Sequence, residues 1–150
     1  HFNDRKYADD DLTLGSIDPY QVFRIFSEIL SCPNANAVDG IAYMIDQSHN
    51  LKGKVEAMVQ SVVTAQELYA KAALIDRARL AELQQSCHLV EAEECFRSAF
   101  WQDVRPLVRE WREARKLPAE PLKALADSGY VDKITHERGS KNARSVSSYA

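Results

Sequence analysis

The chain has 150 residues, and its 45% hydrophobic content is enough for one domain with a sizeable core. Its 19 Lys and Arg against 22 Asp and Glu give a formal net charge of −3, so no overall positive field favours nucleic acid or an anionic membrane surface. No apolar stretch approaches the roughly 20 residues that span a bilayer, and no signal-peptide pattern is present, so we expect a soluble chain.

The first residues predict the end of a strand followed by a polar loop. Residues 1–15 contain Asp, Asn, Lys and Gly15 in place of a periodic apolar pattern. A natural reading frame starts with Met and this chain starts with His1, so we expect residues 1–150 to be the C-terminal part of a longer protein. Asp18 and Pro19 then predict a helix start, because the carboxylate can cap free amides and proline suits the first helical position.

A buried strand is predicted over residues 37–45, because this run is short, nearly continuous and apolar. It ends in Asp46. Together with the first strand end and the helix between them, it predicts a βαβ unit, in which functional residues lie at the carboxyl ends of parallel strands. His1 and Asp46 are then expected on one face of the sheet.

Helices are predicted for the rest of the chain. Apolar residues repeat at helical spacing over 54–85, in one long and possibly broken helix, and again over 90–102. A further helix begins near Pro106, and a last one over 120–128 stops at Gly129. Residues 140–150 form a polar tail that we expect to be mobile. Trp101 and Trp111 are expected in the core or in subunit contacts.

The three cysteines, Cys32, Cys87 and Cys95, are odd in number and match no zinc-knuckle spacing. Although Cys87, His88 and Cys95 lie close in sequence, a fourth zinc ligand is missing. We therefore expect buried thiols in a reducing, cytoplasmic setting.

The candidate site is a set of one imidazole and three carboxylates, which suits hard divalent cations. Its members are His1, Asp9, Asp11 and Asp46. Each has a simpler interpretation: the acidic run Asp9–Asp11 as a solvated loop, Asp46 as a salt-bridge partner or helix cap, and His1 as a residue without a role.

Three motifs resemble those of bacterial L-rhamnose isomerases, within the xylose-isomerase-like superfamily. They are HFNDRKYADDDL at 1–12, GSIDPYQVF at 15–23 and MIDQSHN at 44–50, and the likeness extends to about residue 139. The resemblance implies an α/β fold: residues 1–53 would be the last β/α units of a (β/α)₈ TIM barrel. Residues 54–139 would be a mainly helical C-terminal extension that packs on the barrel and on other subunits, and 140–150 a flexible tail.

The resemblance also implies an activity. Members interconvert an aldose and a ketose, here L-rhamnose and L-rhamnulose, by a metal-assisted 1,2-hydride shift in a cytoplasmic homotetramer. Two divalent cations are used, usually manganese, with cobalt, magnesium or zinc possible. His1 and Asp46 match ligands of the structural metal, Asp9 and Asp11 match ligands of the catalytic metal, and Ser48 matches a residue near the substrate. Asp46 is the candidate for moving a hydroxyl proton.

Other functions remain open, because one barrel supports many reactions. The chain could belong to another superfamily member, such as a ketose epimerase, or could serve as a non-catalytic helical oligomerisation segment. The family's remaining ligands, a Glu, an Asp, a His and a Lys on earlier strands, do not match any part of this chain. We therefore expect residues 1–150 alone to bind manganese weakly and to be inactive.

Overall fold

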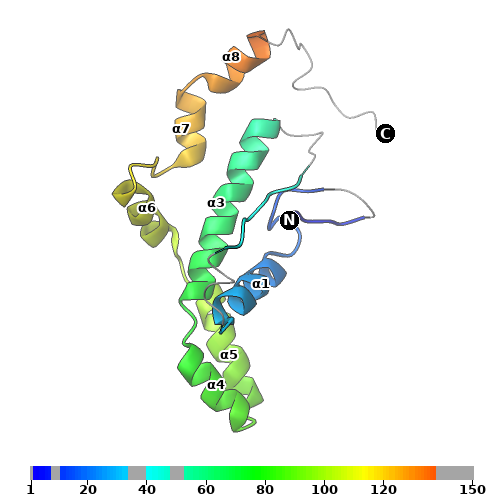
Figure 1. The fold of residues 1–150 in the computed structure, drawn as a ribbon, viewed down its shortest axis with the longest axis vertical. Coiled ribbons are helices and arrows are strands. Elements are labelled where there is room, and N and C mark those ends of the chain that lie inside the picture. Colours follow the sequence, from blue (N-terminus) through cyan, green and yellow to red (C-terminus); the bar gives the residue numbers. More distant parts are fainter. Residues whose placement is uncertain (1, 8–10, 34–39, 48–52, 138–150) are drawn as a thin grey trace.

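The fold is described by a computed structural model that covers residues 2–7, 11–33, 40–47 and 53–137. Helices dominate these residues (Figure 1). They are α1 (Pro19–Ser31), α3 (Lys54–Ala73), α4 (Arg77–Gln85), α5 (Leu89–Phe100), α6 (Arg105–Ala114), α7 (Pro121–Asp127) and α8 (Tyr130–Glu137). The longest, α3, contacts α1, α5, α6 and α7 and so forms the axis on which the other helices are arranged.

Helix α1 begins where the sequence predicts. The Asp18 side chain accepts a hydrogen bond from the Gln21 amide at 2.9 Å, and Pro19 occupies the first turn. At the other end Cys32 adopts an extended conformation, which ends the helix before Pro33. The capping signal was therefore sufficient to predict this helix.

The predicted long helix over 54–85 is broken into α3 and α4. Asp76 separates them, because its side chain accepts from the Arg79 amide at 2.9 Å and so caps a new helix. The helices predicted near 90–102, after Pro106 and over 120–128 are confirmed as α5, α6 and α7. Gly129 follows α7 with a φ of +63°, as expected for a helix stop, but α8 begins directly after it and was not predicted.

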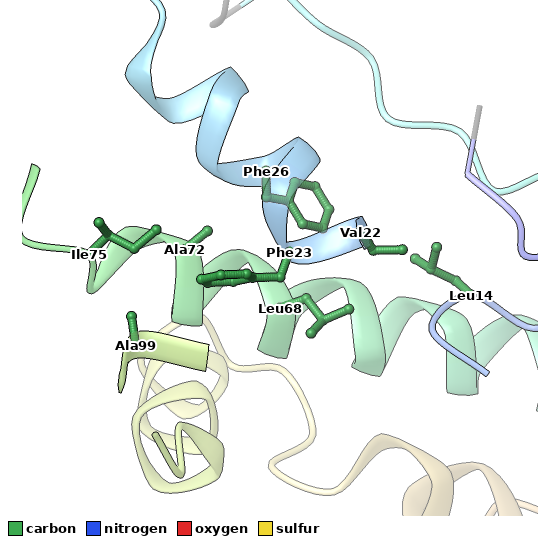
Figure 2. Close-up of a cluster of buried hydrophobic side chains, with 8 residues drawn as sticks. All are labelled: Leu14, Val22, Phe23, Phe26, Leu68, Ala72, Ile75 and Ala99. Atoms are coloured by element: carbon green, nitrogen blue, oxygen red, sulfur yellow. The ribbon is translucent and has the colours of Figure 1, made fainter. Parts of the chain in front are cut away.

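The core lies between α1, α3 and α5 (Figure 2). Phe23 of α1 is fully buried against Leu68 and Ala72 of α3, and its ring centroid lies 4.8 Å from that of Phe96. The remaining buried members of this cluster are Leu14, Val22, Phe26, Ile75 and Ala99. Burial of this apolar set holds α1 against α3 and α5.

Pairing between extended segments is limited, within the described residues, to two isolated bridges. Phe2 pairs in parallel with Ile45: its amide donates to the Met44 carbonyl at 2.7 Å, and the Asp46 amide donates to the Phe2 carbonyl at 3.1 Å. Asp4 pairs antiparallel with Leu12. The chain start and the segment before Asp46 thus run side by side in the same direction.

The buried strand predicted over 37–45 is not found in the part that can be described, residues 40–45. Ile41, Tyr43 and Met44 are 42–53% exposed, because helices of the described chain cover one side of this segment only. Residues 37–39 lie outside the described residues. The assignment to a barrel stays a prediction.

The prediction of buried thiols was wrong. Cys32 and Cys87 are exposed and Cys95 is half-buried, because the first two lie at a helix end and in the turn between α4 and α5. Trp101, at the C-terminal cap of α5, is 72% exposed and so lies outside the core. Trp111 is 41% exposed. Subunit contacts for either tryptophan stay a prediction.

None of the helices in the described ranges combines the length and the apolar character that a bilayer crossing requires.

Candidate metal centre

The candidate site lies where the parallel segments through Phe2 and Ile45 meet. Phe2 faces α1, since its ring stacks on Phe26 with centroids 5.0 Å apart. Successive side chains of extended backbone point to opposite faces, and directly paired residues share a face. Asn3 and Asp46, which follow Phe2 and Ile45, therefore leave from the face turned away from α1. We call this side the carboxylate face.

Asp11 joins the carboxylate face through Asn3. The Asn3 amide Nδ2 donates to Oδ1 of Asp11 at 2.5 Å, and the neighbouring bridge between Asp4 and Leu12 holds the two segments together. Asp11 is half-buried and Asp46 is exposed. Asn3 was not singled out from the sequence, although it lies within the first motif.

The other predicted site residues, His1, Asp9 and Ser48, lie outside the described residues. Within the described part of the chain, no three His, Cys, Asp or Glu side chains cluster closely enough to hold a metal ion. The donors present on the carboxylate face, two carboxylates and an amide, suit a hard divalent cation chemically. Because such a cation takes about six ligands, further donors would have to come from elsewhere.

A buried hydroxyl of α3 contacts the two segments of the candidate site, one through a backbone amide and the other through a side chain. Ser61 is 0% exposed, and its Oγ accepts a hydrogen bond from the Leu14 amide at 3.1 Å. The same hydroxyl donates to Oε1 of Gln47, the residue directly after Asp46. Ser61 was not predicted as part of the site, because a serine within an amphipathic helix gives no such signal.

Asp4 has a structural role that the sequence did not reveal. It is 7% exposed, and its Oδ2 accepts from the amides of Ile17 and Asp18 at 2.7 and 3.2 Å. One carboxylate oxygen thus fixes the loop that leads into α1. Because Asp4 accepts hydrogen bonds from backbone amides, we assign it a structural role and do not count it as a further metal ligand.

Replacing Asp4 by alanine is expected to lower the free energy of unfolding by about 2–3 kcal/mol, because two backbone amides lose a charged acceptor that is itself buried. Replacing Asp18, which caps α1 with one hydrogen bond, should cost about 1 kcal/mol. Urea unfolding of both variants measures the difference. Equal losses would contradict the role given to Asp4.

On the opposite face lies an apolar cavity of about 540 Å³ between the parallel segments, α3 and α6. Phe2, Tyr43 and Ile45 form one wall, and Tyr69 and Trp111 belong to the others. Burial raises the pKa of the Tyr43 hydroxyl above its usual value, and the nearby Tyr69 adds to this shift. A sugar needs polar partners for its hydroxyls, so this cavity does not suit a sugar.

Arg112 attaches α6 to α3 beside this cavity. It is 4% exposed, and its Nε and Nη2 both donate to Oε1 of Gln66, at 2.9 and 2.7 Å. Its Nη1 donates to the Ala119 carbonyl at 3.2 Å. Desolvation lowers the pKa of this guanidinium, while the charge of Glu67 opposes the shift. The buried cation is therefore stabilised mainly by neutral oxygens and holds the cavity wall in place.

The rim of the cavity is expected to make the isolated 150-residue chain self-associate. Val62, Tyr69, Leu107 and Trp111 remain 38–48% exposed around it, and contiguous apolar surface drives association. Leu107→Lys should raise the monomer fraction in sedimentation velocity, and Leu89→Lys, at an equally apolar but distant position, should not. A monomeric native chain, or equal effects of both variants, would contradict this expectation.

Two known proteins are similar to this chain over 140 residues. A protein from Rhizobium meliloti (strain 1021) named probable sugar isomerase is 39% identical, over 92% of this chain and 32% of its own length. A protein of the same description from Mesorhizobium japonicum is 37% identical over the same shares. No protein-family model matches the chain. The chain thus spans about a third of the length of these relatives, and nearly all of it is similar to proteins named as probable sugar isomerases.

Proposed function

We propose that this chain is part of a metal-dependent sugar isomerase that interconverts L-rhamnose and L-rhamnulose. The observation that carries the proposal is the 37–39% identity to two probable sugar isomerases over 92% of the chain. The choice of rhamnose comes from the three motifs, which resemble those of bacterial L-rhamnose isomerases. A small-molecule sugar as substrate agrees with the negative net charge, since no polyanion binding is expected.

The proposed fold is the C-terminal part of a (β/α)₈ barrel, with residues 1–53 as its last β/α units. The parallel pairing of Phe2 with Ile45 and the packing of α1 beside it are what such a unit requires. The carboxylate face, turned away from α1, would then face the barrel interior. The helices from α3 onward would be the extension that contacts other subunits of a cytoplasmic homotetramer.

The proposed cofactors are two divalent cations, with manganese preferred and cobalt, magnesium or zinc as alternatives. His1, Asp9, Asp11 and Asp46 would hold them together with ligands from the rest of the protein. Bound cations would position the sugar hydroxyls and stabilise the negative charge that develops on oxygen as hydrogen moves between C1 and C2. This is the chemistry that the oxygen donors of the carboxylate face suit.

The residues of this chain would then have separate tasks. Asn3 holds Oδ1 of Asp11 by a hydrogen bond and so fixes the orientation of that carboxylate. Asp46 would accept and return a proton of a sugar hydroxyl, which is the task of a carboxylate within reach of the reacting oxygens. Ser48 would contact the substrate.

The test uses the full-length native chain, stripped of metal with a chelator and supplied with L-rhamnose. L-Rhamnulose formation should be lost on stripping and restored by manganese, and product analysis by chromatography should show a C1–C2 change only. Full activity in the presence of the chelator would contradict the proposed dependence on a metal ion. An inverted C3 centre in a ketose product would favour an epimerase.

A non-catalytic role in oligomerisation is the second candidate, favoured by the exposed apolar rim on α3 and α6. Light scattering on the same preparation separates the two functions. An assembled protein that converts no sugar would support this role alone, and an assembled, active protein would support both.

A further inference from the structure

A buried polar side chain that the proposed mechanism does not use lies beneath the candidate site. Ser61 is 0% exposed, although burying an unpaired hydroxyl is unfavourable. Its hydroxyl is paired on both sides: it accepts from the Leu14 amide at 3.1 Å and donates to Oε1 of Gln47. A serine hydroxyl has one proton to give, and here it is given to the segment that carries Asp46.

The two partners of Ser61 lie beside the two described candidate ligands. Leu14 follows Asp11 by three residues, and Gln47 follows Asp46 directly. The segments that contain them are far apart in the sequence and meet on one serine oxygen of α3. Moving the Asp11 loop away from α3 would break the first hydrogen bond, and moving the Asp46 segment beyond the reach of the Gln47 side chain would break the second.

The loop after Asp11 is pressed closely against α3 at this point. Leu14 is 1% exposed and belongs to the core cluster. Gly15 has a φ of +74°, and a Cβ at that position would lie 2.6 Å from Cγ2 of Thr64, one helical turn beyond Ser61. Only glycine allows so close an approach. The packing of Leu14 in the core and of Gly15 against Thr64 therefore holds the loop at the position where the Leu14 amide reaches Ser61.

We propose that Ser61 is a positioning residue that fixes the Asp11 loop and the Asp46 segment in one relative placement. This inference rests on the proposed function, because the purpose of the placement is to present both carboxylates to divalent cations on the carboxylate face. In other proteins, residues that orient metal ligands without contacting the metal contribute about 10- to 100-fold to metal affinity. Ser61 acts here through backbone and amide groups and does not itself reach the cation.

The test compares Ser61→Ala with Ser27→Ala in the full-length native chain. Ser27 is the matched control, because it is also a buried serine within a helix, 3% exposed, and lies on α1 instead of α3. Manganese titration calorimetry of Ser61→Ala should show about 10-fold weaker binding or more. Amide hydrogen exchange should rise at residues 12–14 and 46–47 together. Ser27→Ala should leave both measurements within twofold of the native chain.

Gln47→Met provides a second route that does not alter the core of α3. It removes the amide partner at similar side-chain length, and we expect the same loss of manganese affinity as in Ser61→Ala. Combining the two substitutions should add little, because they break one connection.

Failure of the inference is distinguishable from failure of the proposed function. If the native chain binds manganese and both single variants bind it equally well, the role of Ser61 is refuted while the isomerase proposal stands. If the native chain binds none of manganese, cobalt, magnesium and zinc, the proposed function is refuted. Hydrogen exchange then still decides whether Ser61 joins the two segments, since exchange in Ser61→Ala that does not rise at residues 12–14, or does not rise at 46–47, would refute the connection.

Discussion

Replacing Asp46 by asparagine is expected to lower isomerase activity of the full-length native chain by about 10²–10⁴-fold. Asparagine keeps the shape of the side chain but cannot take up a proton from a sugar hydroxyl, and loss of proton transfer has effects of this size. It also removes a negative charge from the carboxylate face, so manganese binding should weaken. L-Rhamnulose formation at saturating manganese measures the first effect, and titration calorimetry measures the second.

Asp132→Asn is the control for this substitution. Asp132 is an exposed aspartate on α8, and the same change of charge there should leave activity and manganese affinity unaltered. If Asp46→Asn retained more than a tenth of native activity, Asp46 would not be the proton-transfer group, and if it kept native manganese affinity, Asp46 would not be a ligand. Equal losses in both variants would indicate a general effect of charge.

Replacing Phe23 by alanine is expected to lower the free energy of unfolding by about 3–5 kcal/mol, the range for removing a buried aromatic ring. Phe23 is 0% exposed at the junction of α1, α3 and α5, and its ring contacts those of Tyr20, Phe96 and Phe100 at centroid distances of 4.8–5.8 Å. The loss has two parts: the apolar surface returned to water on unfolding is smaller, and a cavity is left behind.

Urea unfolding of the native chain, Phe23→Ala and Leu89→Ala measures this effect. Leu89 is the control, because it is 70% exposed at the start of α5, and its truncation should change stability by less than about 0.5 kcal/mol. A loss below 1 kcal/mol for Phe23→Ala would mean that α1 does not pack on α3 and α5 as described.

Local signals in the sequence predicted the helices well. The Asp18–Pro19 pair and Gly129 each mark a helix boundary through backbone chemistry that depends on neighbouring residues only. The break before α4 was harder to place, because Ile75 continues the apolar pattern into the core while the next residue caps a new helix. Helix α8 was not predicted, because Gly129 signals a helix end and α8 begins at the next residue.

Long-range contacts could not be predicted from the sequence. Asp4 binds the amide of Ile17, Ser61 binds that of Leu14, and Arg112 binds Gln66, over separations of 13, 47 and 46 residues. No periodicity or motif couples such positions, because each contact depends on how α1 and α6 pack on α3. The sequence therefore indicates candidate ligands, but not the residues whose hydrogen bonds fix the segments that carry them.

Part of the candidate site follows from the sequence and part does not. The alternation of extended residues explains why Asp46 leaves from the face opposite Phe2 and Ile45, and Asn3 brings Asp11 to that face. His1, Asp9 and Ser48 lie outside the described residues, so their roles stay predictions. The expected cover over the strand before Asp46 is not found, since Tyr43 and Met44 are about half exposed.

The most direct test of the metal centre is anomalous diffraction at the manganese absorption edge from crystals of the full-length native chain grown with manganese. We expect anomalous peaks on the carboxylate face, with oxygens of Asp11 and Asp46 within about 2.0–2.6 Å of a cation. Manganese peaks at other places only, or ordered carboxylates of Asp11 and Asp46 that contact no cation, would contradict the proposed metal centre.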